Sequence, residues 1–310
     1  MRALVVTNMY PRPDRPELGS FVRDQVQALQ RAGGAEVELF AFPPGGPSAY
    51  VNGAVGLRRR YGRAQFDIVH AHFGLSQWPA LAARGHARAV TLHGTDLAHP
   101  RSRPITLAGL RFTDLVGAVS QSLAATIPQW AVSGRRLAVL PCGVDLARFR
   151  PIARAEARAA LGLDLSGPYL LFASNPARAE KRYDLARQVA GKVRLLALEG
   201  VEPERVPLWV NAANAVLIPS DREGFGLAVL EALACDVPVL ATPVGIAPEA
   251  LADVDGTLCA PFDASRWRTA VAPHLDAAEP RIRGCARAER FSTDRMAARV
   301  LEAWRELLDG

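Results

Sequence analysis

The sequence predicts an α/β protein built from two doubly wound parallel sheets. Short runs of β-branched and aliphatic residues alternate with longer amphipathic stretches along the whole chain. The alternation restarts after a turn-rich break between Asp145 and Pro168. The length of 310 residues is about twice that of a usual single domain. Ligands of such sheets bind beyond the carboxyl ends of the strands, so we expect two such edges to face a central cleft.

The first half contains six short apolar runs that are typical of buried strands. A helix is expected over Ser20–Arg31, where apolar residues recur at helical spacing. The stretch Pro43–Tyr61 begins with turn residues and ends with basic ones, so we expect a loop and a short helix there. The predicted strands are Ala3–Asn8, Val37–Phe42, Phe66–Ala71, Ala89–Gly94, Asp114–Ser120 and Leu137–Gly143.

The second half opens with a short amphipathic helix, Ala155–Leu161, and then repeats the alternation of strand and helix. The predicted strands are Tyr169–Ser174, Val193–Leu198, Ala215–Pro219, Pro238–Thr242 and Gly256–Cys259. The predicted helices lie near Lys181–Gly191, Glu204–Ala213, Phe225–Ala234 and Pro248–Ala252.

The two halves also differ in charge. Residues 1–150 carry 18 arginines and nine acidic side chains, whereas residues 151–310 carry 19 basic and 22 acidic side chains. Lys181 and Lys192 are the two lysines of the chain. We therefore expect a basic N-terminal domain over 1–150 and a C-terminal domain over 151–291, followed by a helix over 292–310 that crosses back onto the N-terminal domain.

The composition excludes several classes of protein. Hydrophobic residues make up 49% and charged residues 22%, which is typical of a globular chain and not of a disordered one. No run approaches the ~18 apolar residues of a membrane-spanning helix, and the N-terminus is typical of a strand and loop rather than a cleavable signal. A cytoplasmic location is expected. The cysteines form no C-x-x-C pair, which argues against a zinc knuckle or a disulfide framework; they are Cys142, Cys235, Cys259 and Cys285.

The segment PSDREGFGLAVLE, residues 219–231, is the most informative for chemistry. A predicted strand leads into a loop with Gly224 and Gly226, and a helix follows. Glycines let a ligand approach the backbone, and the N–H groups at a helix start attract phosphate. Glu223 and Glu231 lie eight residues apart, so one can contact sugar hydroxyls and the other a ribose diol. As an alternative, they are an acidic residue near a helix start and a solvated helix residue.

This segment and the following Ala232-Leu233-Ala234-Cys235 resemble the E-x7-E region of the family-4 retaining glycosyltransferases, of the bacterial glycosyl transferases group 1 type. The resemblance implies the GT-B fold, with two Rossmann-like domains facing a central cleft. It also implies sugar transfer from a nucleoside diphosphate sugar to a hydroxyl acceptor, with retention at the anomeric carbon. The donor-binding residues implied here are Glu223, Gly224, Phe225, Gly226, Leu227 and Glu231, and Glu223 is also implied in catalysis.

A second segment, Phe172–Arg182, is similar to the strand-end loop whose arginine and lysine bind the donor diphosphate in that family. The resemblance implies this role for Arg178 and Lys181, although their spacing is shorter than usual there. A compact ammonium suits a leaving phosphate as a point charge. Without the resemblance, a lone lysine would be read as a solvated surface residue.

Three segments of the first half complete the resemblance. Gly19-Ser20-Phe21-Val22 is similar to the glycine-rich turn that opens the first helix near the donor phosphates, which implies that role for Gly19. As an alternative, Gly19 is an ordinary turn glycine before a helix. Residues 66–72 are similar to the family's D-I-V-H-x-H strand and residues 91–96 to its H-G-x-D strand end. His93 therefore corresponds to the histidine that faces the transferred sugar.

His70 and His72 raise a competing interpretation, because H-x-H at a strand end is typical of metal-dependent hydrolases. Further ligands do not follow at recognisable spacings, so we expect no metal and no cofactor.

The resemblance implies a front-face reaction in which the leaving diphosphate helps to take the acceptor proton. Lys181 and backbone N–H groups would stabilise the developing charge.

Other functions stay open at this stage. A GT-B nucleotide-sugar epimerase or phosphorylase would share the nucleotide site, although a phosphorylase would carry a pyridoxal phosphate lysine, for which Lys192 is an unconvincing candidate. A non-catalytic nucleotide-sugar binding protein is the alternative from another class.

The expected partners are a UDP- or GDP-sugar and a glycan or lipid-linked acceptor of cell-envelope polysaccharide or glycolipid synthesis. The arginines of the first half, among them Arg58-Arg59-Arg60, predict peripheral contact with anionic membrane at the inner face of the plasma membrane, or a merely solvated basic face. Aromatic and basic residues do not interleave, so no nucleic acid is expected.

Overall fold

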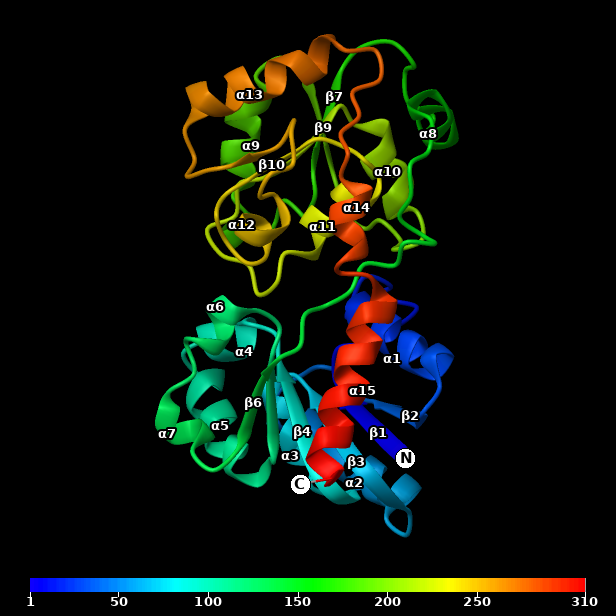
Figure 1. Cartoon of the computed structure of the whole chain (residues 1–310), viewed down its shortest axis with the longest axis vertical. Coiled ribbons are helices and arrows are strands. Elements are labelled where there is room, and N and C mark those ends of the chain that lie inside the picture. Colours follow the sequence, from blue (N-terminus) through cyan, green and yellow to red (C-terminus); the bar gives the residue numbers. More distant parts are fainter. Residues whose placement is uncertain (310) are drawn as a thin grey trace. The chain divides into compact units, whose positions relative to one another are not determined.

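The computed structural model describes residues 1–309, which divide into two compact units. Unit 1 contains residues 1–143 and the segment from Thr293 onward, and unit 2 contains Val144–Ser292. Each unit is built around one parallel β-sheet with helices on it (Figure 1). The prediction of two parallel α/β sheets is confirmed.

The sheet of unit 1 has six strands in the order β2-β1-β3-β4-β5-β6. The order reverses between β1 and β3, which is where a doubly wound sheet opens its ligand crevice. Thr7, His72 and Thr91 lie side by side at the carboxyl ends of three adjacent strands. The strands are β1 (Arg2–Thr7), β2 (Glu36–Ala41), β3 (Gln65–His72), β4 (Arg84–Leu92), β5 (Leu115–Ala118) and β6 (Arg136–Val139).

Helices cover both faces of this sheet, because successive strand residues point to opposite sides. Ala3 and Val5 pack in the core under α1 and α15, whereas Leu4 and Val6 pack in the core under α2 and α3. The helices of unit 1 are α1 (Ser20–Ala32), α2 (Pro47–Tyr61), α3 (Gln77–Ala80), α4 (Thr95–Ala98), α5 (Ser102–Gly109), α6 (Gln121–Ala124), α7 (Gln129–Val132) and α15 (Thr293–Asp309), with 3-10 turns η1 (Gly74–Ser76) and η2 (Leu110–Phe112).

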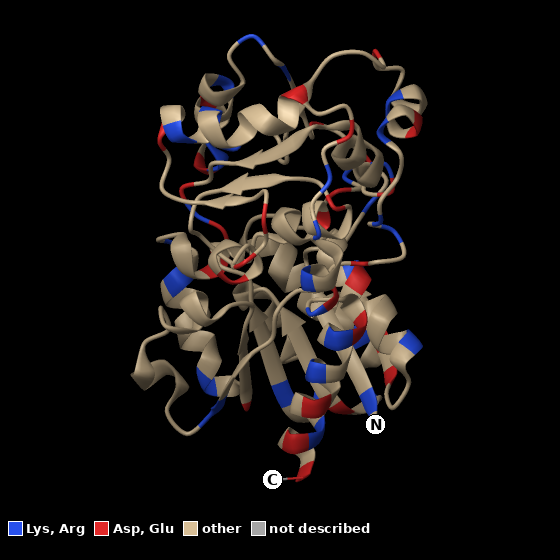
Figure 2. Ribbon diagram, turned by 45° about the horizontal axis from the view of Figure 1, so that its top comes forward, with Lys and Arg blue, Asp and Glu red and all other residues tan. Residues whose placement is uncertain are grey.

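The last helix, α15, packs beside α1 (Figure 1). Met296, Val300 and Trp304 lie four residues apart and are buried, so they form one apolar face of the helix. Basic and acidic residues are interspersed along the rest of its length (Figure 2). This segment, at the far end of the sequence, therefore contributes to the core of the unit that begins the chain.

The sheet of unit 2 has five strands in the order β11-β10-β9-β7-β8, and its order reverses between β7 and β9. Helices α9 and α13 pack on one face through Ala186, Val189 and Trp267. The strands are β7 (Tyr169–Phe172), β8 (Arg194–Ala197), β9 (Ala215–Ile218), β10 (Val239–Ala241) and β11 (Leu258–Cys259). The helices are α8 (Arg154–Leu161), α9 (Tyr183–Ala190), α10 (Val206–Ala212), α11 (Leu227–Ala234), α12 (Ala247–Ala250), α13 (Ala264–Asp276) and α14 (Cys285–Glu289), with the 3-10 turn η3 (Ala179–Lys181).

Two expectations about helices need correction. The stretch expected to be a loop and a short helix contains the 15-residue helix α2, which starts at Pro47. Lys181, expected at the start of a helix, ends the 3-10 turn η3, and α9 begins at Tyr183. Throughout residues 1–309, the helices fall short of the length and apolar character that crossing a bilayer requires.

Candidate active site

The candidate donor site is a cavity of about 90 Å³ in unit 2, at the carboxyl ends of β7 and β9. These are the two strands between which the order of the sheet reverses. Gly226, which precedes α11, and the first two residues of α11 line this cavity, so the N-terminus of that helix faces it. The lining residues are Phe172, Ala173, Ser174, Lys181, Leu217, Ile218, Ser220, Glu223, Gly226, Leu227 and Ala228.

An ion pair between Lys181 and Glu223 forms one wall of this cavity. Lys181 Nζ donates to Glu223 Oε2 over 2.5 Å, and the two side chains are 12% and 10% exposed. The hydroxyl of Ser220 donates to the other carboxylate oxygen, Oε1, over 2.8 Å. Because little water screens these groups, their charges act strongly on whatever occupies the cavity. The structure thus brings together two predicted residues that lie 42 positions apart.

Gly226 and Gly245 give the loop before α11 its shape. Gly226 has φ 90° and ψ 46°, a left-handed conformation that favours glycine. Gly245 has φ 60°, and a Cβ there would lie 2.3 Å from the carbonyl oxygen of Phe225 and 2.8 Å from Cβ of Glu223. The backbone N–H of Ile246 donates to the same carbonyl over 2.7 Å. Gly245 therefore positions Glu223 by close approach, a role that no motif of the sequence indicates.

The other predicted donor residues lie outside the cavity lining. The guanidinium of Arg178 donates to Glu180 Oε1 from Nε and Nη2, over 3.0 and 2.7 Å, and its side chain is 54% exposed. Phe225 is buried, whereas Gly224 and Glu231 are partly buried on the loop and on α11. Lys181, Glu223, Gly226 and Leu227 are thus the predicted residues that the cavity unites.

In unit 1, His93 directly follows β4 and packs against a ring from α1. The ring of Phe21, from the first turn of α1, lies 4.8 Å from the ring of His93.

Gly19 precedes that helix with φ 65°, and a Cβ there would lie 2.2 Å from the carbonyl oxygen of Met9. Gly19 is therefore required by the close approach of the loop after β1, whatever ligand binds nearby.

Asp96 fixes the backbone on which His93 stands. Its Oδ2 accepts from the N–H groups of His93 (3.0 Å) and Gly74 (3.1 Å), and its Oδ1 accepts from Gly94 (2.8 Å). Burial raises the pKa of this carboxyl, although the backbone donors oppose that shift. The H-G-x-D spacing could have indicated this role, since the aspartate turns back onto its own loop.

The H-x-H pair of β3 uses its ring nitrogens for bonds within the protein. Trp304 Nε1 donates to His70 Nδ1 over 3.1 Å, and His70 Nε2 lies 2.8 Å from the hydroxyl of Thr91. His72 Nδ1 lies 3.0 Å from His93 Nε2. Burial lowers the pKa of His72 to about 4 and that of His70 well below its ordinary value. In the part of the chain that the structure describes, no group of three or more His, Cys, Asp or Glu side chains is placed to hold a metal ion.

Family models match both halves of the chain. The model described as Glycosyltransferase Family 4 matches residues 3–148, and the model described as Glycosyl transferases group 1 matches residues 158–283. Together these two segments span nearly the whole sequence, including every predicted site residue.

Curated relatives carry the same kind of name. A D-inositol 3-phosphate glycosyltransferase of Segniliparus rotundus is 33% identical, over 79% of this chain and 67% of that protein. Another of that name, from Actinosynnema mirum, is 30% identical over 86% of this chain and 78% of that protein.

Solved structures match the fold across both units. Sucrose-phosphate synthase from Thermosynechococcus elongatus has a TM-score of 0.74 at 21% identity, with 99% of each chain covered. Anabaena Alr3699/HepE in complex with UDP-glucose has a TM-score of 0.73 at 16% identity, covering 99% of this chain and 100% of that one. At these identities the likeness establishes the fold, and the relatives and family models establish the enzyme class. The chain is a GT-B glycosyltransferase and belongs to glycosyltransferase family 4, as its motifs predicted.

Proposed function

We propose that the protein transfers a sugar from a nucleoside diphosphate sugar to a hydroxyl group of its acceptor, with retention at the anomeric carbon. The observation that carries this proposal is the partly buried Lys181–Glu223 pair beside the N-terminus of α11, in the cavity where the sheet order of unit 2 reverses. A cation and a helix N-terminus at one cavity suit a diphosphate. The complex of Anabaena Alr3699/HepE with UDP-glucose supports the choice of donor class.

In this proposal Lys181 changes partner when the donor binds. Its ammonium, which pairs with Glu223 here, moves toward the diphosphate and leaves the carboxylate to accept hydrogen bonds from hydroxyls of the sugar. The N–H groups at the start of α11 and Gly226 approach the phosphates, while Glu231 binds the ribose diol. Arg178 joins the diphosphate only after releasing Glu180.

The chemical step then depends mainly on charge stabilisation. The leaving diphosphate takes the proton of the acceptor hydroxyl on the same face of the sugar, so configuration is retained. Lys181 and the helix N-terminus stabilise the negative charge that grows on the phosphate as the glycosidic bond breaks. This step assigns no role to a metal ion, so turnover should persist in EDTA, and its loss there would contradict this part of the proposal.

His93 and Gly19 are the contributions of unit 1 to the proposed reaction. His93 offers a hydrogen bond to a hydroxyl of the transferred sugar. Burial and the neighbouring His72 lower the pKa of His93 well below its ordinary value, which favours a neutral ring. Gly19 precedes α1, and we propose that backbone N–H groups at the start of this helix contribute to donor binding.

The acceptor that we propose carries phosphate. The relatives are named for D-inositol 3-phosphate, and the first 150 residues of this chain hold twice as many arginines as acidic residues. A phosphorylated polyol and the phosphorylated headgroup of a membrane lipid share this chemistry. The second source would place the enzyme in cell-envelope glycolipid or polysaccharide synthesis.

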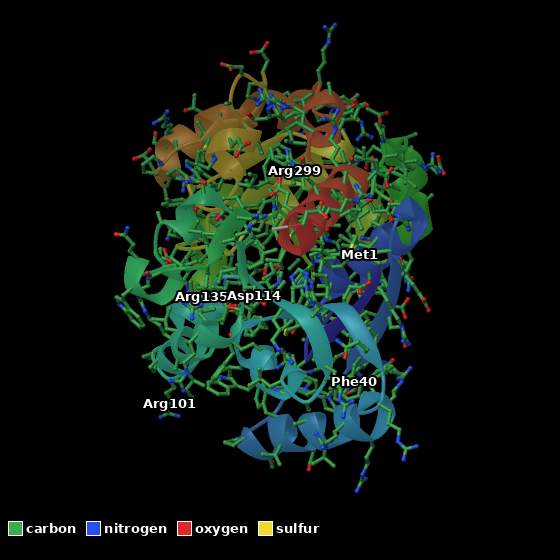
Figure 3. All side chains as sticks on the ribbon, turned by 60° about the horizontal axis from the view of Figure 1, so that its bottom comes forward. Met1, Phe40, Arg101, Asp114, Arg135 and Arg299 are labelled. Carbon is green, nitrogen blue, oxygen red and sulfur yellow. The ribbon has the colours of Figure 1, made fainter. Side chains whose placement is uncertain are left out.

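A surface of unit 1 favours the membrane source. Ile105 and Phe112 are exposed and flank Trp78, whose Nε1 donates to the carbonyl of Ile105. Trp130, 68% exposed, lies on α7, which packs against η2. The guanidinium of Arg111 lies over the ring of Phe112, 4.8 Å from its centroid, and that of Arg135, which Figure 3 labels, donates to the carbonyls of Leu110 and Arg111 in η2. Exposed aromatic and aliphatic residues among arginines suit an interface with anionic lipid.

The membrane contact is tested by sedimentation with vesicles. The protein should sediment with phosphatidylserine-containing vesicles and not with phosphatidylcholine alone. Trp130→Ser should weaken this binding severalfold, because a partly inserted aromatic side chain is lost. Leu165→Ser, at a 59% exposed apolar residue of unit 2, is the matched control and should bind like the parent protein. Equal loss in both variants, or no binding at low salt, would contradict the proposal.

The donor class is tested by thermal shift with UDP-, GDP- and ADP-sugars, followed by assays of transfer. Selective stabilisation by one nucleotide sugar is expected, because only a ligand of the folded state raises the melting temperature. The best donor is then assayed with D-inositol 3-phosphate and with phosphoinositide vesicles, which distinguishes the two sources of acceptor. A protein that binds donor but neither transfers nor slowly hydrolyses it would be a binding protein, and the proposed reaction would be wrong.

A further inference from the structure

A chain of hydrogen bonds inside unit 1 ends on His93. Gln25 of α1 places its side-chain Nε2 3.3 Å from Nε2 of His72, and Nδ1 of His72 lies 3.0 Å from Nε2 of His93. Gln25 and His72 are buried, and the rings of His72 and His93 are stacked with centroids 5.3 Å apart. The sequence motifs indicate His93, but no pattern in them connects it with Gln25.

The donors and acceptors in this chain determine where each proton lies. The amide nitrogen of Gln25 is a donor, so Nε2 of His72 accepts and a neutral His72 carries its proton on Nδ1. That proton is donated to Nε2 of His93. A neutral His93 must then hold its own proton on Nδ1, and Nδ1–H is the group that remains for a ligand.

The neighbouring groups are compatible with neutral rings. His70 stacks on His72 with centroids 4.8 Å apart, and it receives a hydrogen bond at Nδ1 from Trp304, so its proton lies on Nε2 toward Thr91. The carboxylate of Asp96 accepts the backbone N–H of His93, not its ring. Burial lowers the pKa of His72 to about 4, so the proton order holds at neutral pH.

We propose that Gln25 and His72 are positioning residues that fix His93 in its Nδ1–H tautomer, so that His93 presents a neutral N–H donor to the sugar. This inference rests on the proposed function for the contact between His93 and sugar, but the tautomer itself does not. Phe73 supports a shaped site here: it follows His72, has φ 80°, and stacks on His93 at 6.4 Å. Non-glycine residues rarely adopt such a backbone, and when they do it is often at functional sites.

The tautomers are measured first, by NMR of the protein with 15N-labelled histidine and no ligand. We expect the Nδ1–H form for His72 and His93 and the Nε2–H form for His70. The Nε2–H form of His93 in the parent protein would overturn the inference, whatever the activity of the enzyme.

Variants of His72 then test the link to the reaction. Asparagine places an amide nitrogen near the position of Nδ1, so His72→Asn should keep the Nδ1–H form of His93 and most of the activity. Glutamine places its amide near the position of Nε2, so His72→Gln should release His93 and lower kcat/KM about tenfold, by analogy with the loss when a metal-ligating histidine loses the partner that orients it. Gln25→Met removes the first donor without a change of charge and should shift His72 and His93 toward mixed tautomers.

The outcomes separate this inference from the proposed function. Equal activity of His72→Asn and His72→Gln, with folding verified by melting temperature, would overturn the positioning role. If the tautomers are as expected but His93→Ala keeps full activity, the assigned contact with sugar is wrong and the positioning role fails with it. Assays of Lys181→Ala would still report on the donor site in unit 2, which does not depend on this relay.

Discussion

The two units present contrasting environments at the carboxyl edges of similar parallel sheets. In unit 1, His70, His72 and His93 form a stacked group that burial keeps uncharged. In unit 2, Lys181 and Glu223 face a cavity as an ion pair. The fold places both groups at the carboxyl edge of a parallel sheet, and the side chains decide whether that edge acts through charge or through oriented neutral donors.

The difference predicts that acid destabilises the protein chiefly through unit 1. The pKa of His72 is about 4 in the folded protein and 6.5 ordinarily, so between these values the unfolded chain binds a proton that the folded one does not. The free energy of unfolding is therefore complete above about pH 6.5 and falls toward pH 4, by about 1.4 kcal/mol per pH unit for each such histidine. His70 and His93 add to this fall, since their pKa values are lowered too.

Urea unfolding between pH 7 and pH 5 measures this dependence. His72→Asn removes one titrating ring, so its dependence on pH should be shallower than that of the parent protein. A parent protein equally stable at pH 5 and pH 7 would contradict the assignment of neutral buried histidines.

The charged site of unit 2 predicts the largest effect on rate. Lys181→Ala should lower kcat/KM by ~10²–10³, the typical result of removing one donor from a developing anion. The second lysine of the chain provides the matched control. Lys192 is exposed beyond α9, so Lys192→Ala should leave turnover unchanged. Near-normal turnover of Lys181→Ala would remove the basis for the donor site, and similar losses in both variants would point to a general effect of charge.

Gly245 offers a smaller and more local test of the same site. Alanine at φ 60° costs about 1–2 kcal/mol in strain, and its Cβ would also meet the carbonyl of Phe225 at 2.3 Å. Gly162→Ala is the control, because Gly162 has φ 65° with nothing within 4 Å of the added Cβ. Gly245→Ala should therefore lower the free energy of unfolding by about 1–3 kcal/mol more than the control does, and weaken donor binding. Equal effects would mean that the loop before α11 adjusts freely.

The sequence predicts the elements of this fold well where hydrophobic pattern and turn residues agree. Most strands lie within two residues of their expected bounds, as for β1 and β9. Helix α2 is an exception, because Gly53 and Gly56 look like loop residues but lie in the helix. Their missing side chains leave room for aromatic rings: a Cβ on Gly53 would be 3.0 Å from Phe42, and one on Gly56 would be 3.3 Å from Phe40.

The residues of the candidate site also divide into those that the sequence predicts and those that it does not. Lys181, Glu223 and His93 follow from local motifs, although the spacing of Arg178 and Lys181 is shorter than is usual in the family. The partners that set their geometry come from elsewhere in the chain, as Gly245 does for Glu223 and Gln25 for His93. Such pairs depend on how strands are ordered in the sheet and on which helix covers which face, so periodicity along one segment does not reveal them.

Trp304 tests how far the neutral site of unit 1 depends on the end of the chain. Trp304→Phe keeps most of the buried apolar area of α15 but leaves Nδ1 of His70 without its donor. An acceptor left unpaired in the core costs about 1–3 kcal/mol, so the melting temperature should fall. Trp130→Phe, at an exposed tryptophan of the same unit, should leave it unchanged. If Trp304→Phe is as stable as the control, either His70 has changed to the other tautomer or a water molecule donates to its Nδ1. In both cases α15 is held in unit 1 by apolar packing and not by this hydrogen bond.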